Sequence, residues 1–268
     1  MAQSFQTLRA LIWCKTYPEL SSRYAETVCT GAVLEDGSPI RLYPVPFRYM
    51  GEEKRYSLYD WITVPASKSS KDPRPESYKV RSEELRLIEH VESNPTDGWR
   101  ERREFVLKDP SWQFGSIEAL KAAQSEYGRS MGIVTPGAIE NVRLTKKTPK
   151  ERAEFEAKWQ EVSSQGDLFR SEYKELGFLP YDIKLTWRCS ESCSECRNRP
   201  HDMKVLDWGL LELGRRDGWE QAKQRMAALA DLSRYDFRLF MGNFRNHLKT
   251  FGIIGMWYPK IPEQGSLL

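Results

Sequence analysis

The sequence lacks any apolar stretch close to the roughly 18–20 residues that a membrane-spanning helix needs. Its N-terminus also lacks the layout of a secretory signal peptide, and we therefore expect a cytoplasmic protein. The sequence also lacks an excess of charge of one sign, because 41 Lys and Arg residues nearly balance 38 Asp and Glu residues and the net charge is only +3. Bulk charge thus gives no argument for a nucleic-acid partner, and local clusters have to carry one.

The 268 residues, 40% of them hydrophobic, suit a soluble globular protein with a sizeable core. The first third is rich in strand patterns, including a hairpin around Asp36-Gly37. We expect an α+β fold with a mixed, mostly antiparallel β-sheet core, helices in the middle and C-terminal thirds, and a small zinc loop. The expected parts are a β-rich part (1–95), a mainly helical insertion (96–165) and a metal-binding α/β part (166–268). The first and last should pack as one globular unit.

Three helices stand out in the local pattern. One should begin at Ser116 and end at Gly128, which suit an N-cap and a C-cap. A second should begin at Thr148-Pro149 and lie on the surface, because it is charged on most sides. A long helical pattern also follows "KVLDW", although its glycines, Gly218 among them, weaken it.

Three of the five cysteines and one of the three histidines lie within "RCSESCSECRNRPHDM". The spacing C-x3-C-x2-C-x4-H predicts a metal site, because clustered thiols in a reducing compartment favour metal binding over disulfides. Four protein ligands fill a tetrahedral shell and leave no position for water, so we expect structural Zn²⁺. The predicted ligands are Cys189, Cys193, Cys196 and His201.

Iron is the alternative metal. The three cysteines also match the cluster motif of radical S-adenosylmethionine enzymes, but too little chain follows for the barrel that this motif normally opens. An iron–sulfur cluster with four ligands is possible too, although the nearby histidine favours zinc.

Several polar stretches are candidates for function. In "IRLYPVPFR", Arg41, Tyr43 and Arg48 suit the wall of a groove that contacts phosphates and stacks on bases. The alternative is a rigid strand exit with surface arginines. Asp60 and the proline-framed Asp72, Arg74 and Glu76 suit acid–base work or stabilisation of a cationic transition state. A solvated charged loop is the plainer interpretation.

Two further groups are basic or polar. The connection "GNFRNHLK" carries Asn243, Arg245, His247 and Lys249 between two apolar strands, and His247 is the histidine best suited to proton transfer. The metal loop carries Arg188, Arg197 and Arg199, which suit phosphate contacts. Both groups are also compatible with an ordinary polar surface.

Segments along nearly the whole chain resemble a family of bacterial proteins associated with phage defence. They include "AETVCTGAVLEDGSPIRLYPVPFR", "KDPRPES", "LPYDIKLTWRC" and "GNFRNH" followed by "FGIIG". The resemblance implies a DNA glycosylase that flips out and excises glucosylated hydroxymethylcytosine from phage DNA and leaves an abasic site. It makes Asp72 and Glu76 the first catalytic candidates and Asp60 the next, with Arg74 or His247 holding a phosphate or the leaving base.

Two other functions stay open at this point. The protein can be a zinc-containing nucleic-acid-binding module without catalysis. It can also be a nuclease in which Asp60, Asp72 and Glu76 hold Mg²⁺.

Overall fold

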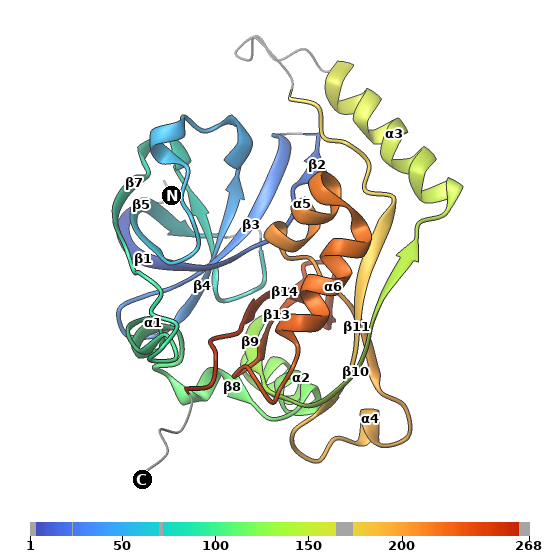
Figure 1. Ribbon diagram of the computed structural model, residues 1–268. Coiled ribbons are helices and arrows are strands. Elements are labelled where there is room, and N and C mark those ends of the chain that lie inside the picture. The colour runs from blue at the N-terminus through green and yellow to red at the C-terminus, as the bar shows by residue number, and fades with distance from the viewer. Residues whose placement is uncertain (1–3, 23, 70–71, 165–173, 263–268) are drawn as a thin grey trace.

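The computed structural model describes residues 4–22, 24–69, 72–164 and 174–262. It has an α+β fold with two lobes, a barrel at the left of Figure 1 and a larger mixed lobe at the right. Most strand pairs are antiparallel, as the sequence predicts. Within the described residues, no helix combines the length and the apolar character that crossing a bilayer requires.

The first lobe is built on seven strands. They are β1 (Gln6–Lys15), β2 (Glu19–Ser21), β3 (Ala25–Val33), β4 (Pro39–Val45), β5 (Asp60–Lys68), β6 (Ser77–Val80) and β7 (Arg86–His90). Short 3₁₀ helices connect some of them, namely η1 (Phe47–Tyr49), η2 (Glu52–Lys54) and η3 (Ser82–Glu84). The predicted hairpin at Asp36-Gly37 is confirmed, because Gly37 adopts a φ of 88° in the turn between β3 and β4.

The strands close into a barrel in the order β1-β3-β4-β6-β5, and β5 pairs with β1 again. The pairing of β4 with β6 is parallel, whereas the other pairings around the ring are antiparallel. This order, with its parallel pair between the third and fifth strands of the ring, is that of an OB-fold barrel. Barrels of this kind bind ligands on their second and third strands and on the loops between strands 1–2 and 4–5.

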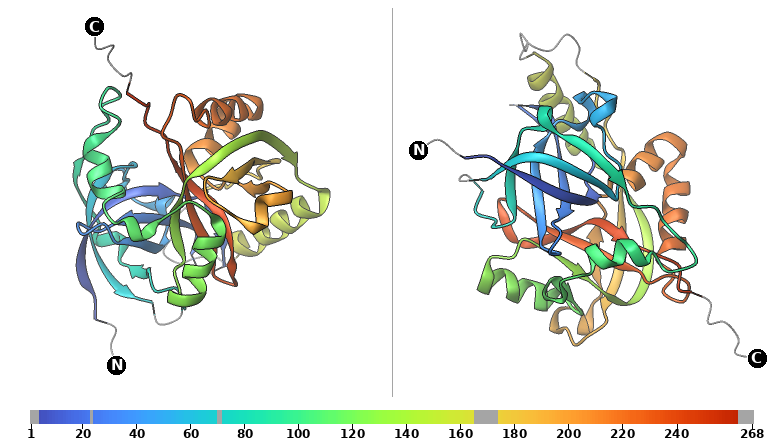
Figure 2. Two further views of the ribbon diagram at one scale, coloured as in Figure 1. Left: turned by 90° about the horizontal axis from the view of Figure 1, so that it is seen from below. Right: turned by 90° about the vertical axis from the view of Figure 1, so that its left-hand side faces the viewer.

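The second lobe holds two sheets. One has the order β10 (Pro136–Lys146), β11 (Tyr181–Cys189) and β12 (His201–Lys204). The other has the order β14 (His247–Trp257), β13 (Arg238–Phe244), β9 (Met131–Val134) and β8 (Gln113–Phe114). Figure 2 shows β13 and β14 between the barrel and the β10–β11 pair.

The helices are α1 (Arg100–Val106), α2 (Ile117–Tyr127), α3 (Pro149–Ser164), α4 (Ser194–Asn198), α5 (Trp208–Asp217) and α6 (Trp219–Leu229), with η4 at Pro110–Trp112. The predicted caps of α2 are confirmed, because Ser116 accepts from Ala119 and Gly128 is left-handed. The long C-terminal pattern forms two helices, because Gly218 has a φ of 113° and ends α5. The segment predicted as a mainly helical insertion (96–165) also contains β8, β9 and the whole of β10.

The two lobes share one core. Among the described residues, five buried side chains of the second lobe belong to the barrel's apolar cluster, namely Met131, Ile133, Phe240, Ile254 and Trp257. The ring centroids of Trp13 and Phe240 lie 4.2 Å apart across this junction. At Gly255 a Cβ atom would come within 2.6 Å of the Cys14 Cβ, so β14 approaches β1 closely only because this residue is glycine.

Candidate functional site

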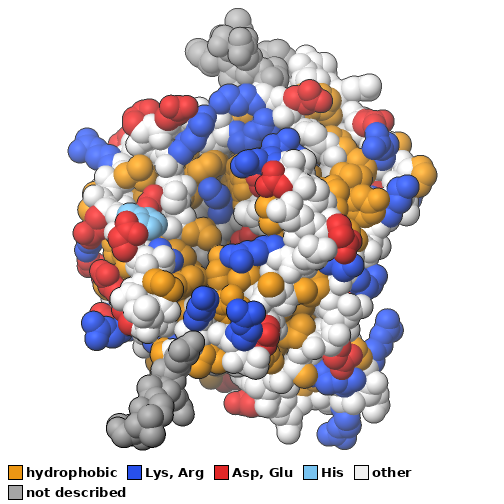
Figure 3. All heavy atoms as spheres, viewed as in Figure 1, with side chains coloured by type: hydrophobic (Ala, Val, Ile, Leu, Met, Phe, Trp, Pro, Cys, Tyr) orange, Lys and Arg blue, Asp and Glu red, His pale blue; other side chains and the backbone are white. Residues whose placement is uncertain are grey.

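A cavity of about 310 Å³ lies between the two lobes, on the barrel face that binds ligands in OB-folds. The barrel side is formed by the segment after β1 (Thr16, Tyr17, Pro18 and Glu19), by Thr27, Cys29, Arg41 and Tyr43, and by Arg74 before β6. The second lobe contributes Lys147, Leu179, Tyr181, Asp182, Val205, Leu206, Leu211, Gly242, Asn243, Phe244, Arg245 and Ile254. Figure 3 shows this side of the molecule hollowed between the lobes, with Lys and Arg side chains around the hollow.

Arg41 crosses the junction from β4 and is only 3% exposed. Its Nη1 donates to Cys29 Sγ at 3.2 Å, and its Nη2 donates to the Ser130 carbonyl at 3.2 Å. Within the described residues its Nε has no hydrogen-bond partner. Glu76 is also buried, and its carboxylate accepts from the Ser130 backbone N (3.0 Å) and Oγ (2.6 Å). A buried network thus joins the guanidinium, the serine and the carboxylate across the two lobes.

Arg74 is held by a two-point contact with Asp72, with Nε–Oδ1 at 2.9 Å and Nη2–Oδ2 at 2.7 Å. Burial works to raise the pKa of Asp72, but the hydrogen bonds and charge of Arg74 outweigh it and hold this pKa below its ordinary value. The Nη1 of Arg74 donates to the Asn243 carbonyl at 3.0 Å. Asp72 therefore positions Arg74 against the second lobe.

Asn243 is the second-last residue of β13, close to the turn that leads into β14, and it is 3% exposed. Its Nδ2 donates to the Leu248 carbonyl at 2.8 Å, which fixes the orientation of the amide. Its backbone N donates to the same Ser130 carbonyl that Arg41 contacts. Within the described residues its Oδ1 lacks a partner, so one acceptor and one Arg41 donor remain unpaired at this wall.

The opposite wall carries charge of both signs. Asp182 lies between Lys147 (3.6 Å) and Lys204 (2.5 Å), which compensate its charge. On the barrel side, Tyr43 is 37% exposed, and its hydroxyl accepts from Thr27 at 3.3 Å. The cavity thus combines guanidinium groups, aromatic rings and carboxylates, which together suit a nucleotide better than a purely apolar ligand.

Several residues that the sequence singles out lie outside the cavity lining. Asp60 contacts the His90 Nδ1 at 2.6 Å and accepts from the Ser57 backbone N. Arg48 pairs with the buried Glu26 at 3.2 Å and donates to a carbonyl of the second lobe. His247 and Lys249 are exposed on the first residues of β14.

The metal cluster forms a separate site at the far end of β11. Cys189 ends β11, Cys193 and Cys196 lie at and within α4, and His201 begins β12. Their ligand atoms all lie within 4.8 Å of one another, so these four residues can hold a metal ion. The His201 Nε2 lies 3.4 Å from the Cys189 Sγ and 3.7 Å from the Cys193 Sγ.

These separations fit a tetrahedral ion, because Zn–S bonds of about 2.3 Å and Zn–N bonds of about 2.0 Å place ligand atoms roughly 3.5–3.8 Å apart. Burial lowers the pKa of His201, which favours the neutral imidazole that ligates metals. The start of α2 supports the loop, since the Ile117 N donates to the Cys189 Sγ and Glu118 accepts from the Ser194 N at 2.7 Å.

The arginines of the metal loop have different roles. Arg188 pairs with Glu140 at 2.5 Å and also donates to the Cys196 carbonyl, so it braces the loop. Arg197 and Arg199 are exposed at its surface.

Comparison with known families divides the chain after α1. A family described as a domain of unknown function (DUF8758) matches residues 6–108. A second, also described as a domain of unknown function (DUF8757), matches residues 112–268, which is more than half of the chain. The chain belongs to the DUF8757 family. No curated protein matches it.

The cavity draws on both matched regions, and the metal site lies wholly in the DUF8757 region. Five of the residues that were predicted as functional from the sequence are part of the cavity lining, namely Arg41, Tyr43, Arg74, Asn243 and Arg245. Sequence reasoning missed Glu19, Lys147 and Asp182, which also line it. The clue was the "TYPE" turn after the first strand, but only the strand order reveals that this turn has the position of the 1–2 loop of an OB-fold barrel.

Proposed function

We propose that the protein binds nucleic acid across the ligand face of the barrel and receives one nucleotide in the cavity between the lobes. The observation that carries this proposal is the position of the cavity on the face and loops that bind oligonucleotides in OB-folds. Arg41, Arg74 and Arg245 supply positive charge there, and Tyr43 and Phe244 supply rings on which a base can stack. The volume of about 310 Å³ suits a single nucleotide unit.

The reaction that we propose in this cavity is excision of a modified base from DNA. The substrate would be glucosylated hydroxymethylcytosine in phage DNA, as the resemblance to phage-defence proteins implies. Such a base has to leave the stack before its glycosidic bond becomes accessible, and a cavity lined by arginine side chains supports that step. The products would be a free base and an abasic site.

The function is tested by incubating the protein with phage DNA that carries this modified base, with and without EDTA, and then with alkali. Breaks that appear only after alkali support base excision. Immediate breaks that EDTA prevents would identify a metal-dependent nuclease, and binding without breaks would identify a non-enzymatic binding module. Absence of binding to both modified and unmodified DNA would refute the proposal.

The binding surface is tested by Tyr43→Ala. Loss of a stacking ring costs about 1–3 kcal/mol per base, so the affinity for a short single strand should fall by that amount in fluorescence anisotropy. Tyr127→Ala is the matched control, because Tyr127 is 64% exposed on α2 and does not line the cavity. Equal effects of the two substitutions would contradict the proposed surface.

We further propose that the metal is Zn²⁺ and that its role is structural. Three cysteines and one histidine complete a tetrahedral shell, so a bound ion would stabilise the α4 loop. The alternative is an iron–sulfur cluster, which elemental analysis and the visible absorption spectrum of purified protein distinguish from zinc. A cytoplasmic location stays a prediction and agrees with five free cysteines.

A further inference from the structure

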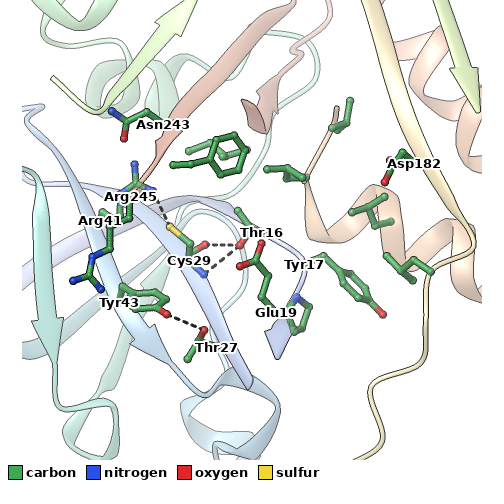
Figure 4. Close-up of a pocket in the computed structure, with 18 of the residues that line it drawn as sticks. Thr16, Tyr17, Glu19, Thr27, Cys29, Arg41, Tyr43, Asp182, Asn243 and Arg245 are labelled. Carbon is green, nitrogen blue, oxygen red and sulfur yellow. Dashed lines mark hydrogen bonds between the residues drawn. The ribbon is translucent and has the colours of Figure 1, made fainter. Parts of the chain in front are cut away.

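The cavity has two carboxylates in its lining, and they differ in their surroundings. Asp182 is compensated by Lys147 and Lys204. Glu19 is exposed, and within the described residues no hydrogen bond or ion pair engages its carboxylate. In Figure 4 the Glu19 side chain points toward Thr16 and Cys29, that is, into the cavity. Glu19 is therefore the uncommitted acid of this site.

The carboxylates that the sequence favours are engaged elsewhere. Asp72 holds Arg74, Glu76 holds Ser130 in the buried junction, and Asp60 contacts His90 outside the lining. Each of these carboxylates would have to give up a short contact before it could serve a substrate. Glu19 can do so without that cost.

The backbone of Glu19 is held in place although none of the described residues engages its carboxylate. It pairs with Thr27 in the antiparallel β2–β3 ladder. Two residues before Glu19, the Tyr17 backbone N donates to the Leu206 carbonyl of the second lobe at 2.9 Å. The next residue, Leu20, is buried. Anchors on both sides thus limit the positions that the carboxylate can reach, as a positioned reactive group requires.

A free carboxylate is a disadvantage in a cavity that only binds nucleic acid, because it repels the phosphates. Base excision gives it a use. Cleavage of a glycosidic bond develops positive charge on the sugar, and a nearby carboxylate stabilises that charge.

We infer that Glu19 is the catalytic carboxylate of base excision, an assignment that rests on the proposed function. The bond between C1′ and the base nitrogen breaks, and its electron pair leaves with the base. A water oxygen then bonds to C1′, Glu19 accepts one proton from that water and returns it to solvent, and the departing base takes up a proton from solvent. The products are the free base and an abasic sugar, so atoms and charge balance.

The test is Glu19→Gln, which keeps the shape of the side chain and removes its charge. Single-turnover formation of alkali-labile sites on the modified phage DNA should fall at least about 100-fold. Affinity for the same DNA should stay equal or increase, because one repulsive charge is lost. Glu126→Gln is the matched control, since Glu126 is an exposed acid on α2 that does not line the cavity. It should leave the rate unchanged.

Chemical rescue supplies a second readout. Added formate should restore part of the activity of Glu19→Ala, which loss of a merely structural contact would not allow. Activity of Glu19→Gln within about threefold of the wild-type rate would overturn the assignment and leave the proposed function intact. Joint loss of binding and activity would also overturn it, because Glu19 would then be a binding residue. If the wild-type protein binds the DNA without forming alkali-labile sites, base excision itself is refuted.

Discussion

Asp207 is a buried carboxylate whose charge should cost stability at neutral pH. It is the N-cap of α5, and its Oδ1 accepts from the Leu210 N at 2.8 Å. Burial raises its pKa from 3.8 to about 6, although the hydrogen bonds and the charge of Lys15 act in the opposite direction. A shift of about 2 pKa units corresponds to about 3 kcal/mol between the two protonation states.

The sign follows from proton linkage. The folded protein binds more protons at Asp207 than the unfolded chain does between pH 3.8 and about 6. The stability that this group contributes is therefore fully present below pH 3.8 and is lost as the pH rises through 6. An asparagine at this position would not titrate, and asparagine is as good an N-cap as aspartate. Asp207→Asn should thus be close to neutral at pH 4 and stabilising by about 1–3 kcal/mol at pH 8.

The lower end of that range allows for Lys15. Burial lowers the pKa of Lys15 to about 8, whereas the Asp207 charge acts to raise it. Removal of the carboxylate deprives the ammonium of this attraction and offsets part of the gain.

The assay is urea unfolding of both proteins across pH 4–8, followed by tryptophan fluorescence. The difference between the two proteins cancels the other titrating groups, including the metal ligands. Asp236→Asn is the control of opposite sign. Burial works to raise the Asp236 pKa, but hydrogen bonds and charge from Arg238 and Arg103 hold it below 3.8, so the stability from this carboxylate is lost only below the pH range of the assay and the variant should be destabilised by a nearly constant amount across pH 4–8. A pH-independent difference for Asp207→Asn, or destabilisation that grows with pH, would refute the reasoning.

Three further predictions concern the metal loop and the junction of the lobes. Cys196→Ser should reduce the bound metal to well below one equivalent in elemental analysis and should lower the melting temperature; full metal content would contradict the ligand assignment. Gly255→Ala should cost about 1–3 kcal/mol in thermal unfolding because the new methyl meets β1, whereas Gly177→Ala has open space and should be neutral. Ser130→Ala should cost about 1–3 kcal/mol in urea unfolding by leaving the buried Glu76 short of a donor, and an unchanged midpoint would show that the network adds no stability.

Local sequence signals predicted local structure well. The Asp36-Gly37 turn and the caps of α2 depend on residues next to each other, so their chemistry can be read directly. Barrel closure cannot be read in this way. The pairing of β1 with β5 joins residues 50 to 60 positions apart, and the parallel β4–β6 pair depends on register rather than on composition.

The same distinction between local and long-range contacts explains which parts of the candidate site the sequence predicts. The metal ligands lie within one short stretch, and their cluster follows from spacing alone. The acidic residues of the loop before β6 had the right chemistry for catalysis, but whether a carboxylate is free depends on distant partners. Glu76 meets Ser130, 54 positions along the chain, and no local pattern announces that contact. No local sequence pattern distinguishes Glu19 from other acidic residues in turns, so the sequence did not predict its place in the cavity lining.

The core shared by the lobes has a consequence for how this protein can be divided. A chain cut between residues 108 and 112, where the two family matches meet, would leave the barrel without Phe240, Ile254 and Trp257. Each fragment would expose an apolar surface made for the other, and neither would carry a complete cavity. The two halves therefore depend on each other for a complete apolar core. Expressed as separate genes, they should behave as a split protein whose pieces reassemble into one working unit.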